Sequence, residues 1–414
     1  IKLAVAGAVL SAASVANAGI VIPAGDWTLD INGNVNAFAT WSSFDGNKAN
    51  NETMAGSIFT AYGGLGPTDA RREDNTQGIN TGLLPSWLGF TGTTRQNDVD
   101  VSFTISMQPN ASDNFATGDA TINDDSAGVS RSPLARQAFL TFGDKSWGTV
   151  KVGKDIGIFA SNAILNDMTL LGVGSAAGNS GNPTTTGGIG TGYIYAAWKG
   201  QFAYTTPNMN GFQATIAAVN PNMIDRDGLN GSTKDQTSFG LEAEATYEWT
   251  GDIAGKVWAS TAQYHDVKDD GYVNGTGQAW DVQMWDVGVN LNSGNFGLTA
   301  YYYDGEGGGS GVLGYYGADS TGKEHDSDGG YLQATYVIPT GTKLGVAYGT
   351  TRVDNNSASA AALVDEQNRW TVGAYHPLTK HLNLVAEYND IEVESHNNIE
   401  NEAQAISLGA ILFF

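Results

Sequence analysis

The sequence predicts an all-β protein, a closed up-and-down antiparallel barrel of about sixteen strands that crosses a membrane. Three observations support this fold class: strands in which apolar and polar residues alternate, connections that alternate between short and long, and an apolar C-terminal strand. The chain has 414 residues, of which 55 are glycine and only 15% are charged. So few charges are unusual for the surface of a soluble protein.

Alternation with a period of two is clearest at 99–107 (VDVSFTISM), 239–249 (FGLEAEATYEW) and 382–388 (LNLVAEY). Successive side chains of a strand point to opposite faces of its sheet. Each of these strands is therefore expected to have one apolar face and one polar face, a pattern that a soluble sandwich would share. The polar faces carry the carboxylates of Asp100, Glu242, Glu244, Glu248 and Glu387.

The connections between strand candidates distinguish a membrane barrel from a soluble sandwich. Tight turns alternate with long polar loops along the whole chain, as expected when all turns lie on one side of a membrane and all loops on the other. A soluble Greek-key protein has no reason to keep this rhythm. The strand candidates lie near 26–43, 82–95, 98–109, 134–143, 147–154, 192–206, 210–219, 237–250, 253–267, 279–292, 295–304, 329–339, 342–353, 367–377, 380–393 and 402–414.

The chain ends in ISLGAILFF, in which alternate residues from Ile406 to Phe414 form one apolar face. Hydrocarbon cannot hydrogen-bond to backbone groups, so a sheet in a bilayer must close without a free edge. We therefore expect the last strand to pair with the first, TLDINGNVNAFATW, and to turn its apolar face toward lipid. Five aromatic residues close to tight turns are expected at the membrane–water interface: Trp147, Tyr204, Trp249, Phe296 and Tyr375.

Residues 1–18 differ in composition from the rest of the chain. Lys2 precedes an apolar run that ends at Leu10, and Ala16-Asn17-Ala18 has the small-x-small spacing of a signal-peptide cleavage site. The run is shorter than the roughly 20 apolar residues that a membrane-spanning helix needs. We therefore expect a signal peptide at 1–18 and a single barrel domain at 19–414.

Composition and motifs argue against several other classes of protein. A net charge of −23 argues against nucleic-acid binding, which needs a basic face, and the chain has no cysteine. The five histidines show no metal-binding spacing, and no Gly-x-Ser-x-Gly elbow is present. The Asp- and Gly-rich stretches 225–235 and 266–275 lack the spacing of a calcium loop. We expect no metal, no cofactor and no catalysis.

Three segments resemble the general diffusion porins of Gram-negative outer membranes. RQAFLTFGDKSWGTVKVGKD (136–155) resembles the family's Arg-x-Ala-aromatic strand, tight turn and Gly-Thr-Val strand, which lead into the constriction loop. YTTPNMNGF (204–212) resembles a hairpin of the family, and PLTKHLNLVAEY (377–388) resembles its penultimate strand. Phe414 matches the family's terminal signal for barrel assembly.

The resemblance implies a sixteen-stranded barrel, usually a homotrimer, that lets small hydrophilic solutes diffuse across the outer membrane. Its expected partners are outer-membrane lipid, lipopolysaccharide and the barrel-assembly machinery. In the family the third long loop folds into the barrel and narrows it, and here that constriction loop is 155–191. Within it, NDMTLLGVG is similar to the family's acidic segment and places Asp167 on the acidic position. Arg136 falls on the position of an arginine that faces the loop.

Several residues depart from the family's pattern. Trp87 stands where an arginine is common, Leu171 where a second loop carboxylate is expected, and Lys154 where an arginine often closes the strand. The field across the constriction is therefore expected to be weaker than in the family. Alternation also groups Arg136 with Leu140, which leaves a position at the rim or in a subunit contact as the alternative to a lumen position.

Carboxylates in lipid are costly, so the polar strand faces are expected to line a water-filled lumen. Five basic residues concentrate around the entry of the constriction loop and partly offset these acidic residues, which predicts a weak cation preference: Arg95, Arg131, Arg136, Lys151 and Lys154. Asp155, at the same entry, is also expected to line the constriction. Two alternatives stay open. A substrate-specific channel would carry an aromatic slide or a basic ladder, and an outer-membrane adhesin or enzyme would have a plugged barrel.

Overall fold

The computed structural model describes residues 19–46, 54, 56–58, 75–109, 111, 134–175, 184–221, 238–268, 279–311, 313–319, 321–355 and 363–414. The expected signal peptide lies outside these residues, as do stretch 225–235 and most of stretch 266–275. Within the described part of the chain, no helix is long and apolar enough to cross a membrane.

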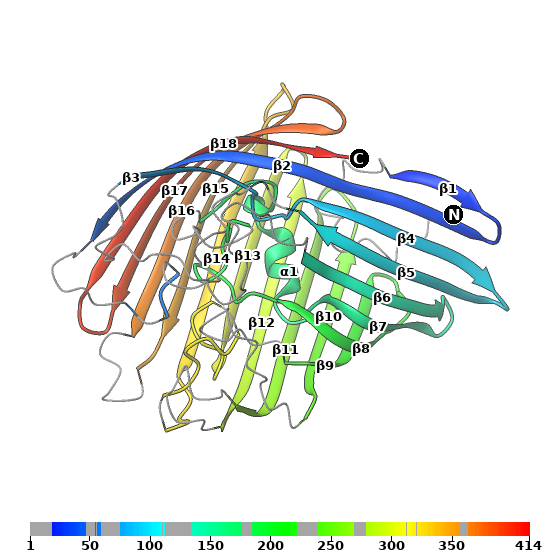
Figure 1. Cartoon of the computed structure of the whole chain (residues 1–414), viewed down its shortest axis with the longest axis horizontal. Helices are drawn as coiled ribbons and strands as arrows, with labels where there is room; N and C mark the ends of the chain where they lie inside the picture. Colours follow the sequence, from blue (N-terminus) through cyan, green and yellow to red (C-terminus); the bar gives the residue numbers. More distant parts are fainter. Residues whose placement is uncertain are drawn as a thin grey trace, which may run out of the picture.

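The strands form one antiparallel sheet that closes on itself (Figure 1). β2 (Trp27–Gly46) pairs with β18 (Glu400–Phe413) on one side and with β4 (Trp87–Gln96) on the other. The expected pairing of the last strand with the first is thus confirmed. The other long strands are β5 (Val99–Gln108), β6 (Leu134–Asp144), β7 (Gly148–Ile156), β8 (Trp198–Thr205), β9 (Phe212–Val219), β10 (Gly240–Trp249), β11 (Ala254–Lys268), β12 (Ala279–Ser293), β13 (Phe296–Glu306), β14 (Asp326–Val337), β15 (Lys343–Val353), β16 (Val364–Pro377) and β17 (Leu382–Ser395).

Two short strands extend their neighbours and do not add positions to the wall. β1 (Ile20–Ala24) pairs with β2 just beyond the point where β18 ends, so it continues the line of β18. β3 (Asn75–Asn80) pairs with β2 on the side of β4 and continues the line of β4. The 18 strands of the sheet therefore fill sixteen positions around the barrel, as the sequence predicts.

The predicted start of the strand at 82–95 is wrong. The wall breaks between β3 and β4, and β4 begins only at Trp87. Residues 81–86 leave the sheet and approach the lumen, where the Leu83 N–H donates to the Gly172 carbonyl at 3.0 Å. A Cβ at Gly82 would lie 2.2 Å from the Gly172 oxygen, so only glycine fits there. Pro85 has no N–H to contribute to a ladder.

Side chains of β2 satisfy the backbone groups that this break exposes. The Asn36 amide donates to the Leu84 carbonyl at 2.9 Å, and its oxygen accepts from the Gly82 N–H at 2.8 Å. Asn34 donates to the Pro85 carbonyl at 2.9 Å. Irregular backbone at membrane depth is tolerated where protein partners replace the ladder.

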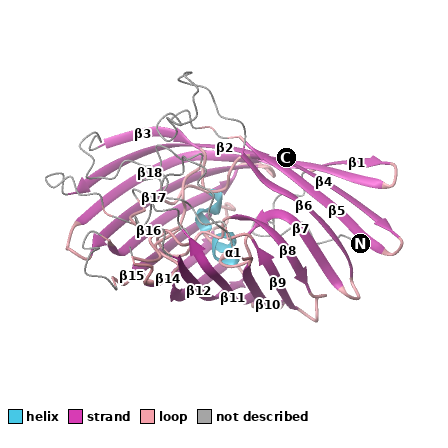
Figure 2. Ribbon diagram, turned by 60° about the horizontal axis from the view of Figure 1, so that its bottom comes forward, coloured by secondary structure: helices cyan, strands magenta, loops and turns pink. Residues whose placement is uncertain are grey.

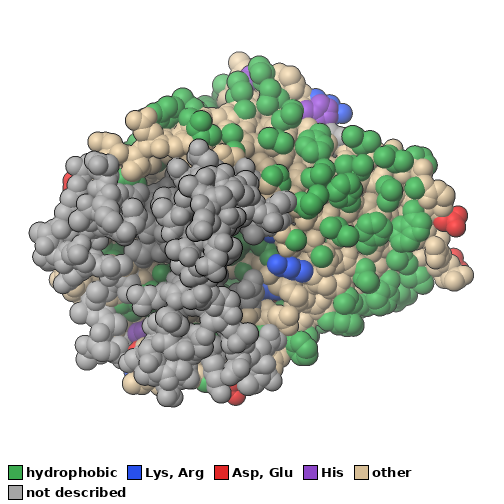
Figure 3. Space-filling view, in the orientation of Figure 1, with side chains coloured by type: hydrophobic (Ala, Val, Ile, Leu, Met, Phe, Trp, Pro, Cys, Tyr) green, Lys and Arg blue, Asp and Glu red, His purple; other side chains and the backbone are tan. Residues whose placement is uncertain are grey.

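The outer face of the barrel is apolar and the inner face is polar. Hydrophobic side chains cover the outside of the strands on the right of Figure 3. The predicted alternation is confirmed in all three segments, with Ile105, Leu241 and Leu384 exposed on the outside. Inside, hydroxyl groups bond across neighbouring strands, as between Thr91 and Thr104 at 3.1 Å.

Most of the aromatic residues expected near the interface face outward. Trp147, Tyr204 and Phe296 are exposed on the outer face close to tight turns. Tyr375 was expected with them, and this is wrong. It is 2% exposed on the inner face, and its hydroxyl donates to Glu387 Oε1 at 2.7 Å. Nearness to a turn does not determine on which side of the sheet an aromatic ring lies.

The outward residues of β18 give a test of the lipid-facing band. Replacing Leu408 by Arg near the middle of this band is expected to destabilise the folded barrel by about 2–4 kcal/mol, because lipid cannot solvate the charge. Glu402→Arg, on the same face near the long loops, is expected to cost about 0–1 kcal/mol. Guanidinium unfolding in phospholipid vesicles measures both, and equal losses would contradict the assigned band.

Candidate constriction of the barrel

The described parts of loop 155–191 run inside the barrel. The short helix α1 (Ser161–Asn166) and the 3-10 turn η3 (Met168–Leu171) lie within the ring of strands (Figure 2). The first anchor is on β10, where Glu242 Oε2 accepts the N–H groups of Ile158 at 2.6 Å and Phe159 at 3.1 Å. The second anchor is Asp286 on β12, which accepts the Ala160 N–H at 3.1 Å.

Further anchors carry the loop across to the other side of the barrel. On β14, Gln333 Oε1 accepts the Met168 N–H at 2.6 Å. On β17, Glu387 Oε2 accepts the N–H groups of Val173 at 3.0 Å and Gly174 at 2.7 Å. The loop leaves the wall after β7 and reaches β17, so it crosses the lumen.

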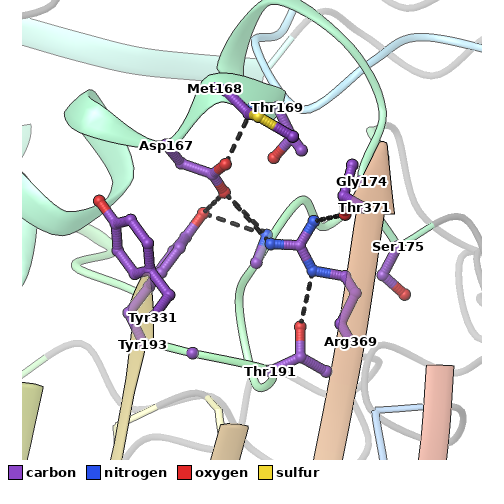
Figure 4. A network of polar contacts seen from close by, with 12 residues as sticks. Asp167, Met168, Thr169, Gly174, Ser175, Thr191, Tyr193, Tyr331, Arg369 and Thr371 are labelled. Carbon is purple, nitrogen blue, oxygen red and sulfur yellow. Dashed lines mark hydrogen bonds and ion pairs between the residues drawn. The ribbon is translucent and has the colours of Figure 1, made fainter. Parts of the chain in front are cut away.

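Asp167 lies at the centre of a buried polar network (Figure 4). Its Oδ1 accepts the Thr169 N–H at 2.8 Å, and its Oδ2 accepts the Tyr193 hydroxyl at 2.8 Å. The Arg369 guanidinium of β16 lies 3.8 Å from the same Oδ2 and donates to Thr191 Oγ1 at 3.2 Å. Burial, followed by the charge of Asp167, raises the pKa of the Tyr193 hydroxyl, so it stays protonated and donates.

Two carboxylates that the sequence assigns to a water-filled lumen are covered by the loop. Glu242 is 0% exposed and Glu387 is 3% exposed. Glu242 also accepts hydrogen bonds from the Lys199 ammonium and the Tyr264 hydroxyl. The expectation that these two side chains face lumen water is therefore wrong. Irregular backbone in the lumen needs acceptors for its N–H groups, and inward carboxylates supply them.

Four other predicted lining residues lie on the inner face. Glu244 borders the lumen and accepts a hydrogen bond from the Asn162 side chain. Lys151 donates to Asp155 Oδ2 at 2.5 Å, so both are paired at the start of the loop. Asp100 lies at the turn end of β5, with Oδ1 2.8 Å from Nη1 of Arg95.

Arg136 and Lys154 lie on the outer face, so their predicted place in the lumen is wrong. Arg136 shares its face of β6 with Leu140, which is 45% exposed, and Lys154 pairs with Ala138 on the same face. The Arg136 guanidinium lies over the Trp198 ring at 5.8 Å. The alternative of a rim or subunit-contact position, suggested by alternation, agrees with this geometry.

A cavity of about 1060 Å³ opens on the turn side of the constriction loop. Asn162 and Asn166 of α1 border it on one side, and Lys256, Asn290 and Lys343 border it from the wall. Its polar lining makes it suitable for water and small hydrophilic solutes.

Sequence reasoning missed Arg369, Asp286 and Lys199. The signal was present for all three of them. In NRWTVGAY, Arg369 alternates with the outward Trp370 and Val372, and in WKGQF, Lys199 alternates with Trp198 and Gly200. In MWDVGVN, Asp286 alternates with the outward Trp285 and Val287. A charge on the polar face of a barrel strand points inward. The atoms of the constriction loop that such a charge contacts depend on the path of the loop, and the loop sequence has no periodicity from which to predict this path.

The Glu387 anchor provides a prediction on stability. Glu387→Leu leaves the N–H groups of Val173 and Gly174 without their acceptor, and each buried unpaired group costs about 1–3 kcal/mol. We expect lower stability and faster proteolysis within 168–175. Glu392→Leu, an exposed position on the outer face of the same strand, is the control. Guanidinium unfolding and limited proteolysis measure both, and identical behaviour would rule out the anchor.

Known proteins share this architecture. The family model of the Gram-negative porins matches residues 3–396. No curated protein matches the chain by sequence. Among solved structures, the outer membrane channel DcaP of Acinetobacter baumannii aligns with a TM-score of 0.64 at 16% identity, covering 95% of this chain and 99% of that one.

Two further structures have the same fold. An anion-selective porin from Comamonas acidovorans aligns with a TM-score of 0.58 at 14% identity over 94% of this chain and 100% of that one. OmpF of Salmonella typhi, in complex with daunomycin, aligns with a TM-score of 0.56 at 14% identity over 94% and 100%. Since the family model matches nearly the whole chain, the protein belongs to the Gram-negative porin family and is an outer-membrane channel through which small hydrophilic solutes diffuse passively.

Proposed function

We propose that this porin sorts solutes mainly by size, with only weak discrimination by charge. The observation that supports this proposal is that the buried charges at the constriction are either paired or covered by the loop. Arg369 compensates Asp167, and Lys199 compensates Glu242. Asp286 and Glu387 are buried and accept hydrogen bonds from N–H groups of the loop. A solute passing the loop therefore meets few uncompensated charges from the described part of the wall.

A strong transverse field needs opposite charges on opposite walls with water between them. Here the charges of Asp167 and Arg369 are neighbours, and each side chain is only 2% exposed. Adjacent opposite charges act as a short dipole, so their potentials largely cancel at the distance of a passing ion. Lys151 and Asp155 are also adjacent opposite charges, so their potentials cancel in the same way. The lumen thus loses two acidic residues on which the expected cation preference depended, Glu242 and Glu387. It also loses two basic residues that were expected to oppose this preference, Arg136 and Lys154.

A substrate-specific channel is the second candidate. Its expected mark, an aromatic slide, would require rings in contact with lumen water. Tyr301, Tyr303 and Tyr331 do face inward, but they are 5%, 0% and 6% exposed beneath the constriction loop. Lys256 and Lys343 border the turn-side cavity, and two cations do not make a ladder along the channel. Among the described residues, these observations favour the general channel. We propose no catalytic activity.

We also propose that the protein assembles as a homotrimer, as one structurally similar protein, OmpT of Vibrio cholerae, has been solved in a trimer form. We further propose that the assembly machinery binds β18 through its outward residues, ending at Phe414. Outer-membrane lipid and lipopolysaccharide are the proposed contacts of the apolar outer face. Light scattering of the detergent-solubilised protein is expected to give the mass of three chains, and the mass of one chain would refute the trimer.

Planar bilayers test the proposed selectivity. We expect ohmic single-channel steps and a reversal potential close to zero across a salt gradient, because the described charges at the constriction are paired or buried beneath the loop. Glu387→Leu is expected to increase the conductance and its noise while leaving the reversal potential nearly unchanged. Glu392→Leu serves as the control for both quantities. Strong selectivity for either sign of ion would contradict the proposal, and a silent bilayer would contradict channel function itself.

A further inference from the structure

A second long loop folds into the barrel beside the constriction loop. It joins β13 to β14, and the structure describes its residues 307–311, 313–319 and 321–325. Leu313 is 0% exposed and Ala318 is 3% exposed. Leu313 belongs to the same buried cluster as Phe159 of the constriction loop, Ile194 just after that loop, and Met284 on the inner face of β12. The loop therefore covers inner wall and does not project away from the membrane.

This loop contacts the constriction loop and the residues after it backbone to backbone. The Tyr195 N–H donates to the Gly311 carbonyl at 2.7 Å. A Cβ built on Gly311 would lie 3.0 Å from the Cα of Gly190, so the backbones of the two loops touch without intervening side chains. Such close contact leaves no room for water between the two loops at this point.

Ser310 connects the second loop to two other parts of the barrel. Its carbonyl accepts from Gln367 Nε2 of β16 at 3.1 Å, and its hydroxyl donates at 2.5 Å to the carbonyl of Gly56, which lies between β2 and β3 in the chain. The same Gln367 accepts the Ile58 N–H through Oε1 at 2.5 Å. On the opposite side, Trp280 Nε1 donates to the Gly307 carbonyl at 3.4 Å. The loop is therefore held at several points from β12 to β16.

We propose that the loop at 307–325 is a second constriction element, which fills part of the lumen on the long-loop side and holds 188–195 in place. A sixteen-stranded barrel encloses a wide aqueous channel unless inserted segments narrow it. Two interlocked loops narrow it more than one. The inference rests on the proposed sorting by size, and it identifies this loop as a second determinant of the size limit.

Cysteine chemistry tests where the loop lies, independently of transport. The chain has no native cysteine, so introduced ones report without background. Gly308→Cys combined with Met284→Cys is expected to form a disulfide in the folded protein under mild oxidation, because a Cβ at Gly308 would lie 3.1 Å from Cγ of Met284, the position that the sulfur of a cysteine takes. Met284→Cys combined with Asn295→Cys, which lies in a tight turn at the other end of the barrel, is expected to stay reduced. Failure of the first pair to cross-link would overturn the proposal.

Labelling provides a second measurement of the same placement. Leu313→Cys is expected to resist a bulky water-soluble maleimide, whereas Glu306→Cys on the exposed outer face is expected to react quickly. Rapid labelling of Leu313→Cys in the folded barrel would contradict an inward loop, even if a shortened variant could not be produced.

Shortening the loop tests its effect on the pore. Glu306 and Asp326 pair directly across β13 and β14, so a two-residue turn replacing 307–325 can join the strands. We expect this variant to show larger conductance steps and to admit larger neutral sugars in liposome swelling. An unchanged size limit in a conducting variant would overturn the inference and leave the proposed function standing. A wild-type protein that does not conduct would instead refute the proposed function.

Discussion

Backbone N–H and C=O groups find no water inside a bilayer, and the described parts of the wall and of the constriction loop are arranged around that constraint. In the barrel wall, closure of the sheet gives the backbone groups their partners. β18 pairs with β2, and β1 and β3 continue the lines of β18 and β4 where those strands stop. Where the ladder breaks at 81–86, Asn34 and Asn36 bond to the freed backbone groups. The backbone groups of Gly82, Leu84 and Pro85 at this break therefore have side-chain partners.

The same requirement explains the arrangement inside the lumen. A loop that crosses the barrel has no regular ladder, so its N–H groups need other acceptors. Glu242, Asp286 and Glu387 supply them from three strands. Hydrogen bonds to charged acceptors are stronger than those to neutral ones, which suits a loop that must keep one position beside water. The inward carboxylates thus position the loop, and this role removes them from contact with ions.

Charge pairing at the constriction has a consequence for selectivity. Burying a carboxylate is costly unless it is paired and hydrogen-bonded, and Asp167 meets both conditions through Arg369, Tyr193 and backbone N–H groups. Because its charge is compensated, Asp167 holds the constriction loop in place and adds little to the electric field across the channel. Loop packing, including that of 307–325, then has the larger part in determining which solutes pass.

The sequence by itself determined the barrel, its sixteen positions, the pairing of its ends and the inner or outer face of most strands. A period of two, a rhythm of turns and loops, and the absence of water in lipid are enough for these. Only the tertiary structure decided which charges reach the water. Glu242 and Glu387 lie on the predicted face but under a loop. The outer position of Arg136, by contrast, agrees with its alternation with Leu140 and not with the motif that it resembles. The reason is physical: strand faces follow from local alternation, whereas the path of a non-periodic loop depends on acceptors supplied by strands far away in the chain.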